Sequence, residues 1–66
     1  MRRIFALNLK QGDVFTRALY PKERFLALVD GDQYNSLGHQ MYVYDSFSSK
    51  IRSLMISRHD WVEVIE

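Results

Sequence analysis

The sequence contains no cysteine, only one proline and only three glycines. Without cysteine there are no disulfides and no thiolate metal sites, which is typical of a reducing cytoplasm. No apolar run approaches the ~20 residues of a membrane span. The apolar segment after Met1-Arg2-Arg3 is interrupted at Lys10, with no small-residue cleavage site behind it, so we read it as a strand and not a signal peptide. We therefore expect a soluble, cytoplasmic protein without membrane contact.

The chain has 66 residues, of which 47% are hydrophobic, and it includes four phenylalanines, four tyrosines and one tryptophan. That composition is typical of a globular domain and not of a disordered tail. A chain of this size buries only ~60% of the surface that its unfolded form exposes, so its core is small and leaves little room for a deep cleft. We expect one domain spanning residues 1–66.

The net charge is only +1, which excludes a strong overall attraction to nucleic acid. The charges are nevertheless unevenly distributed along the chain. Residues 1–24 carry six basic and two acidic side chains, whereas residues 25–45 carry three aspartates and no basic residue. The folded molecule is therefore expected to present one basic and one acidic surface, which is compatible with a charged partner.

Short apolar runs separated by turn residues every eight to twelve positions predict an all-β fold. The expected strands are 3–7, 13–19, 24–30, 39–45, 51–56 and 61–65. We expect Pro21 to end the second of them, because proline cannot donate to a ladder. The third is the most apolar and is expected to be covered on both faces. In the fourth, alternation predicts that Met41 and Val43 face the core while Tyr42 and Tyr44 face outward.

Two stretches resemble the SH3-like small-barrel family. "LKQGDVF" (9–15) is similar to the family's diverging turn, and "MISRHDWVEVIE" (55–66) is similar to its C-terminal strand, 3-10 turn and closing strand. Together they cover about a third of the chain. The resemblance implies a small SH3-like barrel of five or six short antiparallel strands, with one 3-10 turn before the last strand.

The chain departs from this family where SH3 domains bind proline-rich peptides. The Ala-Leu-Tyr-Pro run at 18–21 follows the turn at 9–13 instead of preceding it. Arg24 and Phe25 stand where the family has a pair of tryptophans, and the 3-10 turn lacks its proline. The aromatic grooves that read polyproline helices are therefore not expected here.

Ser57, His59 and Asp60 are the residue types of a hydrolytic triad, but they lie within one short turn, where side chains diverge. We expect Ser57 to cap that turn through its hydroxyl, and Asp60 to serve in the turn or pair with Arg58. Asp30 and Asp32 begin like a calcium loop, but Tyr34 and Asn35 break the pattern. The sequence thus predicts no catalytic residues, metal site or cofactor.

A binding surface is the functional interpretation that the aromatic residues favour. Phe5, Phe15 and Phe25 are expected in the core, whereas the outward-facing aromatics have no place there. Tyrosine and tryptophan next to arginine are the side chains that anchor protein interfaces. The residues expected to bind a partner are Tyr42, Tyr44, Trp61, Arg24, Arg52 and Arg58.

The predicted function is that of a small non-catalytic protein-binding module. By analogy of size and architecture, it would be a regulator, such as a phage or mobile-element protein that binds and modulates a host protein. Basic residues interleaved with aromatics also suit single-stranded RNA or DNA, and nucleic-acid binding is the alternative. Self-association is a third alternative, because a small barrel leaves strand edges that pair with another copy.

Overall fold

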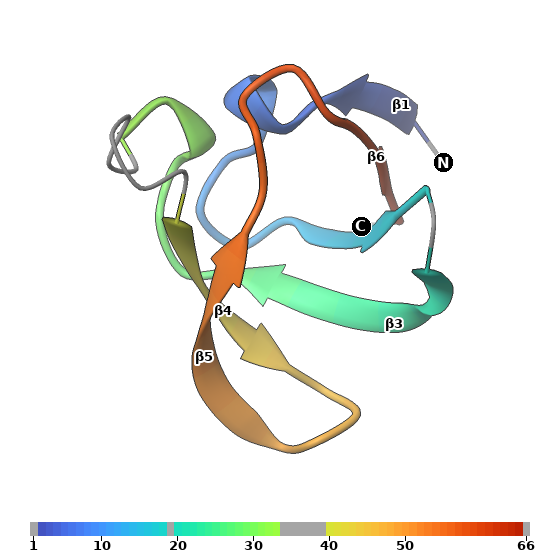
Figure 1. Ribbon diagram of the computed structural model, residues 1–66, viewed down its shortest axis with the longest axis vertical. Coiled ribbons are helices and arrows are strands. Elements are labelled where there is room, and N and C mark those ends of the chain that lie inside the picture. Colours follow the sequence, from blue (N-terminus) through green and yellow to red (C-terminus); the bar gives the residue numbers. More distant parts are fainter. Residues whose placement is uncertain (1, 19, 34–39, 66) are drawn as a thin grey trace.

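Six antiparallel strands form one sheet in the computed structural model, which describes residues 2–18, 20–33 and 40–65 (Figure 1). The strand order in the sheet is β1-β6-β2-β3-β4-β5. The strands are β1 (Arg2–Phe5), β2 (Val14–Arg17), β3 (Tyr20–Ala27), β4 (Gln40–Asp45), β5 (Lys50–Met55) and β6 (Trp61–Val64). The all-β prediction and the number of strands are confirmed. The sheet is not closed, since β1 pairs only with β6 and β5 only with β4.

The sheet is strongly curved, so that its two edge strands lie at opposite ends of the molecule (Figure 1). The β4–β5 hairpin crosses β3 at a steep angle and projects beyond it, while β1 and β6 lie at the other end (Figure 1). Residues 56–60 connect these two ends. They are held by backbone hydrogen bonds from Ala6 N–H to the Asp60 carbonyl and from Leu7 N–H to the Arg58 carbonyl, both 2.9 Å.

The core lies on the concave face and consists of side chains that alternate along the strands. Met41 and Val43 of β4 are buried, and Tyr42 and Tyr44 point outward as predicted. In β6, Val62 and Val64 are buried and Trp61 is exposed. The remaining buried apolar residues are Ala6, Leu9, Phe15, Phe25, Ala27, Leu54 and Ile56.

The N-terminal strand is shorter than predicted, because Ala6–Asn8 form the 3-10 helix η1. The chain leaves the sheet there, since η1 is bonded to the β5–β6 connection and not to a neighbouring strand. Phe5 was expected in the core, but it lies in register with the outward-facing Trp61 and is only half-buried. The prediction that Phe5 is a core residue is therefore wrong.

The prediction that Pro21 ends a strand is also wrong, because Pro21 is the second residue of β3. The irregularity of the β2–β3 pairing explains why proline is tolerated. Arg17 pairs with Tyr20, and the next pair in the ladder is Phe15 with Phe25. The register therefore shifts between these two pairs, and Pro21 lies in the unpaired part of β3. β4 pairs only with Phe25–Ala27, so the missing N–H of Pro21 removes no ladder bond. Leu26 is half-buried, so β3 is not fully covered on its outer face.

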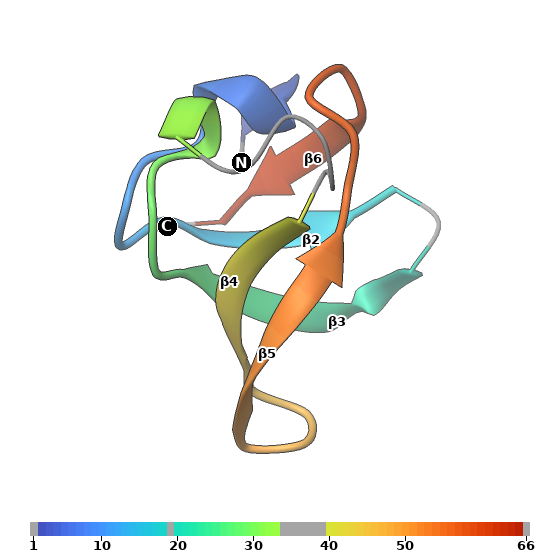
Figure 2. The same ribbon diagram turned by 60° about the vertical axis from the view of Figure 1, so that its left-hand side comes forward.

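The turn at residues 10–13 forms as predicted. Asp13 accepts a hydrogen bond from Lys10 N–H at its carboxylate (2.9 Å) and donates its own N–H to the Lys10 carbonyl (2.9 Å). Gly12 has a φ of 95°, a conformation that favours glycine. A second 3-10 helix, η2 (Gly31–Gln33), lies beside η1 (Figure 2). Residues 34–39, including Tyr34 and Asn35, lie outside the described residues.

The connection before the last strand contains the single tight turn that the sequence predicts. Asp60 N–H donates to the Ser57 carbonyl at 3.1 Å, which is the i→i+3 bond of a 3-10 turn. Ser57 was predicted to cap this turn through its hydroxyl. The contact in the structure is a different one, because the Ser57 backbone N–H donates to the Asp60 carboxylate at 3.0 Å. Arg58 forms no ion pair with Asp60, so of the two roles expected for Asp60 the structure shows the one within the turn.

An ion pair between the buried Asp45 and the exposed Arg52 lies at the far end of the β4–β5 hairpin. Asp45 is only 2% exposed, and its carboxylate accepts hydrogen bonds from the Arg52 guanidinium (3.0 Å) and from Phe47 N–H (3.0 Å). We predict that Asp45→Ala lowers the free energy of unfolding by about 2 kcal/mol, because both donors lose their partner. Asp45→Asn, which keeps an acceptor for Phe47 N–H, should cost about half as much. Urea denaturation measures both values, and equal losses would mean that the Phe47 bond contributes nothing.

Candidate binding groove

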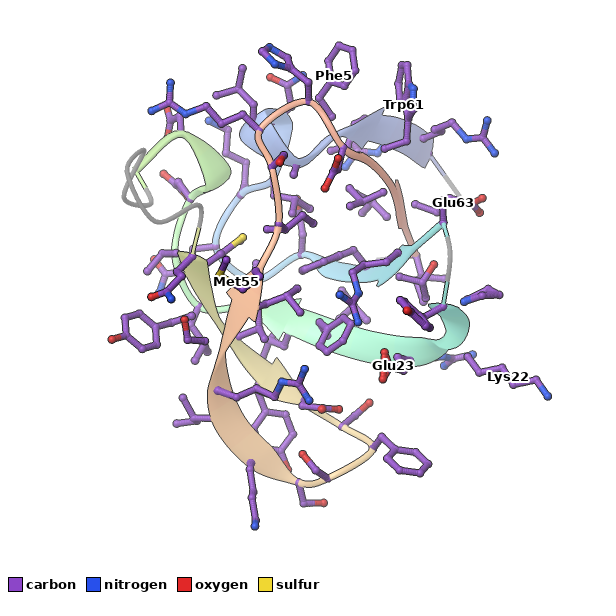
Figure 3. All side chains as sticks on the ribbon, in the orientation of Figure 1. Phe5, Lys22, Glu23, Met55, Trp61 and Glu63 are labelled. Carbon is purple, nitrogen blue, oxygen red and sulfur yellow. The ribbon has the colours of Figure 1, made fainter. Side chains whose placement is uncertain are left out.

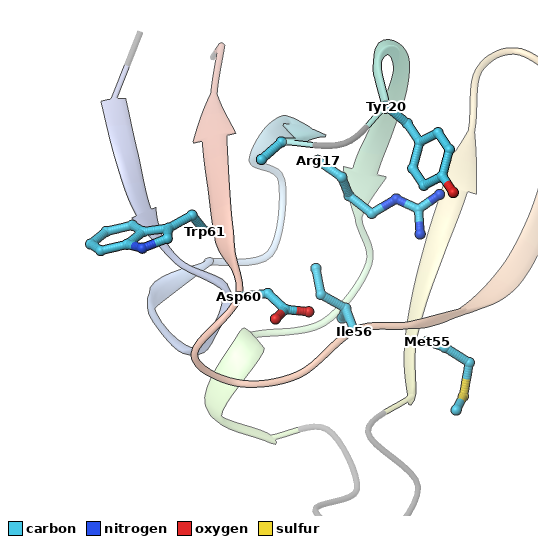
Figure 4. A pocket seen from close by; sticks show the side chains of 7 residues that line it. Arg17, Tyr20, Met55, Ile56, Asp60 and Trp61 are labelled. Atoms are coloured by element: carbon cyan, nitrogen blue, oxygen red, sulfur yellow. The ribbon is translucent and has the colours of Figure 1, made fainter.

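A groove lies between the β2–β3 hairpin and the segment that joins β5 to β6 (Figure 4). We call it the seam groove. Its volume is about 230 Å³. It is lined by Arg17, Ala18, Tyr20, Met55, Ile56, Asp60 and Trp61. Ile56 is 3% exposed and belongs to the core, whereas Tyr20, Met55 and Trp61 are 53%, 64% and 49% exposed.

Arg17 forms one wall of the seam groove and is held by three contacts. Its guanidinium donates to the Glu23 carboxylate at 2.9 Å and lies over the rings of Tyr20 (4.7 Å) and Phe25 (5.3 Å). Arg17 pairs with Tyr20 beside the irregular part of the β2–β3 ladder, where one residue of β2 lies opposite four residues of β3, including Glu23. The positive charge of Arg17 is therefore balanced by Glu23 of β3.

Asp60 forms the opposite side of the seam groove. Its carboxylate is exposed, points toward Ile56 in Figure 4, and accepts the Ser57 N–H described above. Among the described residues, no lysine, arginine or histidine nitrogen forms an ion pair with it. Asp60 thus contributes a negative charge that is not neutralised within this part of the chain.

Trp61 borders the groove but directs its ring away from Arg17 and Tyr20 (Figure 4). The indole stacks on Phe5, with ring centroids 4.3 Å apart and an interplanar angle of 27°. The two rings lie side by side at the β1–β6 end (Figure 3), and His59 meets the edge of Phe5 at 5.4 Å. This cross-strand stack fixes Trp61, so the border of the groove is preorganised.

The residues predicted to bind a partner are not gathered at one place. Tyr42, Tyr44 and Arg24 lie on the convex face of the sheet, and Arg24 and Tyr44 line one shallow depression of about 280 Å³. We call these three residues the tyrosine face. Trp61 lies on β6, which is separated from β4 by two strands, β2 and β3, in the sheet order.

The other two predicted arginines do not line the seam groove. Arg52 pairs with Asp45, as described above, and its guanidinium lies over the Phe25 ring at 5.9 Å. Arg58 is half-buried in the turn before β6, and its Nε has no hydrogen-bond partner among the described residues. Of the six predicted residues, only Trp61 borders the seam groove.

Sequence reasoning did not select Arg17, Tyr20 or Met55. Met55 is far from Arg17 and Tyr20 in the chain, and the groove forms only because the fold brings the β5–β6 connection opposite the β2–β3 hairpin. A weak signal was present in the alternation of β5, which places Met55 on the outward face with Ile51.

Ser57, His59 and Asp60 all belong to the turn before β6. The Ser57 backbone, not its hydroxyl, contacts Asp60, and His59 contacts Phe5. Asp30 accepts the N–H of Gln11 at 2.8 Å, which ties the loop before η2 to the turn at 10–13. Within residues 2–18, 20–33 and 40–65, no cluster of histidine and acidic side chains is suited to hold a metal ion. In the same ranges, no helix has the length and hydropathy to cross a membrane.

Comparisons with protein-family models, curated proteins and solved structures found no match for this chain.

Proposed function

We propose that this chain is a small, non-catalytic module that binds another protein through the seam groove. The observation that carries the proposal is the exposure of three large side chains, Tyr20, Met55 and Trp61, around one concave site. Three of the seven exposed large apolar side chains of the described residues border this one groove, and such a group of exposed apolar side chains favours a contact surface. Aromatic residues and methionine are also enriched at protein interfaces.

The size of the groove supports a macromolecular ligand. Pockets for small molecules generally enclose about 300–1,000 Å³, whereas the seam groove has about 230 Å³. That space suits one or two side chains of a partner, with the rest of the contact made across the surrounding surface.

We also propose that the fold is an SH3-like small barrel whose seam between β5 and the β1–β6 end stays open. The antiparallel order, the turn at 10–13 and the tight turn before β6 support it.

Single-stranded nucleic acid is the second candidate, and the tyrosine face is the observation that favours it. Tyr42 is 61% exposed and Tyr44 37%, on the same face as the exposed Arg24, so bases have rings to stack on and phosphates have a cation. We rank it second because three of the nine basic side chains are already paired. Arg3, Arg17 and Arg52 contact Glu63, Glu23 and Asp45.

A pull-down with the tagged protein, from the cells in which it is naturally made, separates the two candidates. We expect a discrete protein partner that survives nuclease and high salt. Tyr20→Ala and Met55→Lys should weaken that partner at least about tenfold, as expected at an interface hot spot. Tyr42→Ala is the matched control and should leave binding unchanged.

The opposite pattern would overturn the proposal. If Tyr42→Ala removes the partner and Tyr20→Ala does not, the tyrosine face is the binding surface. A signal lost with nuclease and falling steeply with salt would identify a nucleic-acid binder, because counterion release controls that affinity.

A further inference from the structure

The seam groove has an unbalanced charge. Arg17 and Asp60 are the two residues with formally charged side chains in its lining. Arg17 is neutralised by Glu23 at 2.9 Å, whereas Asp60 has no ion pair within the described part of the chain. The groove therefore carries a negative charge on one side, although the whole chain has a net charge of +1.

The rest of the lining is mostly apolar. Ala18, Met55 and Ile56 contribute hydrocarbon, and the Asp60 carboxylate is directed toward Ile56 (Figure 4). A ligand group that fits this arrangement must offer an apolar stem and a cationic end. Lysine and arginine have this form, because their methylene stems pack on apolar surface while the charged ends reach a polar partner.

We propose, on the premise that the seam groove is the protein-binding site, that it receives a lysine or arginine side chain from an exposed segment of the partner. The stem packs along Ile56 and Met55, and the cation pairs with the Asp60 carboxylate. An acidic side chain would be repelled by the negative charge of Asp60. A purely apolar side chain would desolvate that carboxylate without giving it a new partner, which costs free energy.

Asp60 also stabilises the turn before β6, so the variant used in the test must preserve that hydrogen bond. Its carboxylate accepts the Ser57 N–H at 3.0 Å, and Asp60→Asn retains an acceptor oxygen for that bond while removing the charge. The circular dichroism spectrum and melting temperature of Asp60→Asn should therefore stay close to those of the wild type.

The probe is a displayed library of random ten-residue peptides, selected on the full chain. We expect selected peptides to share a basic residue and to lose binding to Tyr20→Ala and Met55→Lys. A synthetic selected peptide should bind about fivefold more weakly when its lysine is acetylated or its arginine is replaced by citrulline, since each change removes the charge and keeps the stem. Asp60→Asn should weaken the unmodified peptide by a similar factor and leave the modified peptide unchanged.

The outcomes distinguish this inference from the function on which it rests. Peptides that need Tyr20 and Met55 but carry no basic residue, or that bind Asp60→Asn as well as wild type, overturn the inference and leave the protein-binding proposal standing. If no selected peptide depends on Tyr20 or Met55 and the pull-down partner does not either, both proposals fail together.

Discussion

Phe25→Ala is expected to leave the chain largely unfolded at 25 °C. Phe25 is fully buried, lies 5.7 Å from the ring of Phe15, and is covered by the guanidinium groups of Arg17 and Arg52. Replacing a buried phenylalanine by alanine costs about 3–5 kcal/mol. A domain of this size without disulfides or metal rarely has more than about 3–5 kcal/mol of stability in total. The loss is therefore comparable to the whole free energy of unfolding.

Phe47→Ala is the matched control, because Phe47 is 86% exposed at the tip of the β4–β5 hairpin. The same change of side chain should shift the unfolding free energy by no more than about 0.5 kcal/mol there. Urea denaturation followed by circular dichroism measures both variants. A cooperative transition in Phe25→Ala, with a loss below about 1 kcal/mol, would show that Phe25 is not central to the core.

The sequence predicted the strands best where one face is buried and the other exposed. In β4 the alternation of Met41 and Val43 with the two tyrosines specifies both the strand and its orientation, because a shift of one residue would invert every side chain. Phe5 shows the limit of the same reasoning. An aromatic residue in a short strand suits either face, and the pairing with Trp61, which decides the face, joins opposite ends of the chain.

The binding site was less predictable than the fold. Outward-facing tyrosines and Trp61 were identified correctly, but their distribution over β4 and β6 depends on the strand order, which local patterns do not contain. Arg17 was not among the residues predicted to bind a partner, because its position depends on the irregular β2–β3 pairing and on Glu23 across the hairpin. The seam groove combines residues of the β2–β3 hairpin with residues 55–61, and only the folded chain brings these segments together.

Gly31→Ala is the second large effect that we expect, and it tests how the two 3-10 helices are joined. Gly31 begins η2, is buried, and donates its N–H to the Leu9 carbonyl at 2.8 Å. A methyl group at residue 31 would overlap the carbonyl oxygen of Ala6, which is backbone and is fixed within η1. Because neither side can yield as a flexible side chain would, we predict a loss of about 3 kcal/mol.

Gly12→Ala separates this steric effect from the ordinary cost of losing a glycine. Gly12 has a φ of 95°, but nothing lies within 4 Å of the position that a methyl group would occupy. Only the backbone conformation is then unfavourable, which costs about 1–2 kcal/mol. Thermal and urea unfolding should therefore show that Gly31→Ala is clearly less stable than Gly12→Ala. Equal losses, or a milder effect at residue 31, would mean that η1 and η2 can move apart without disturbing the core, and that the Gly31–Leu9 hydrogen bond does not hold them together.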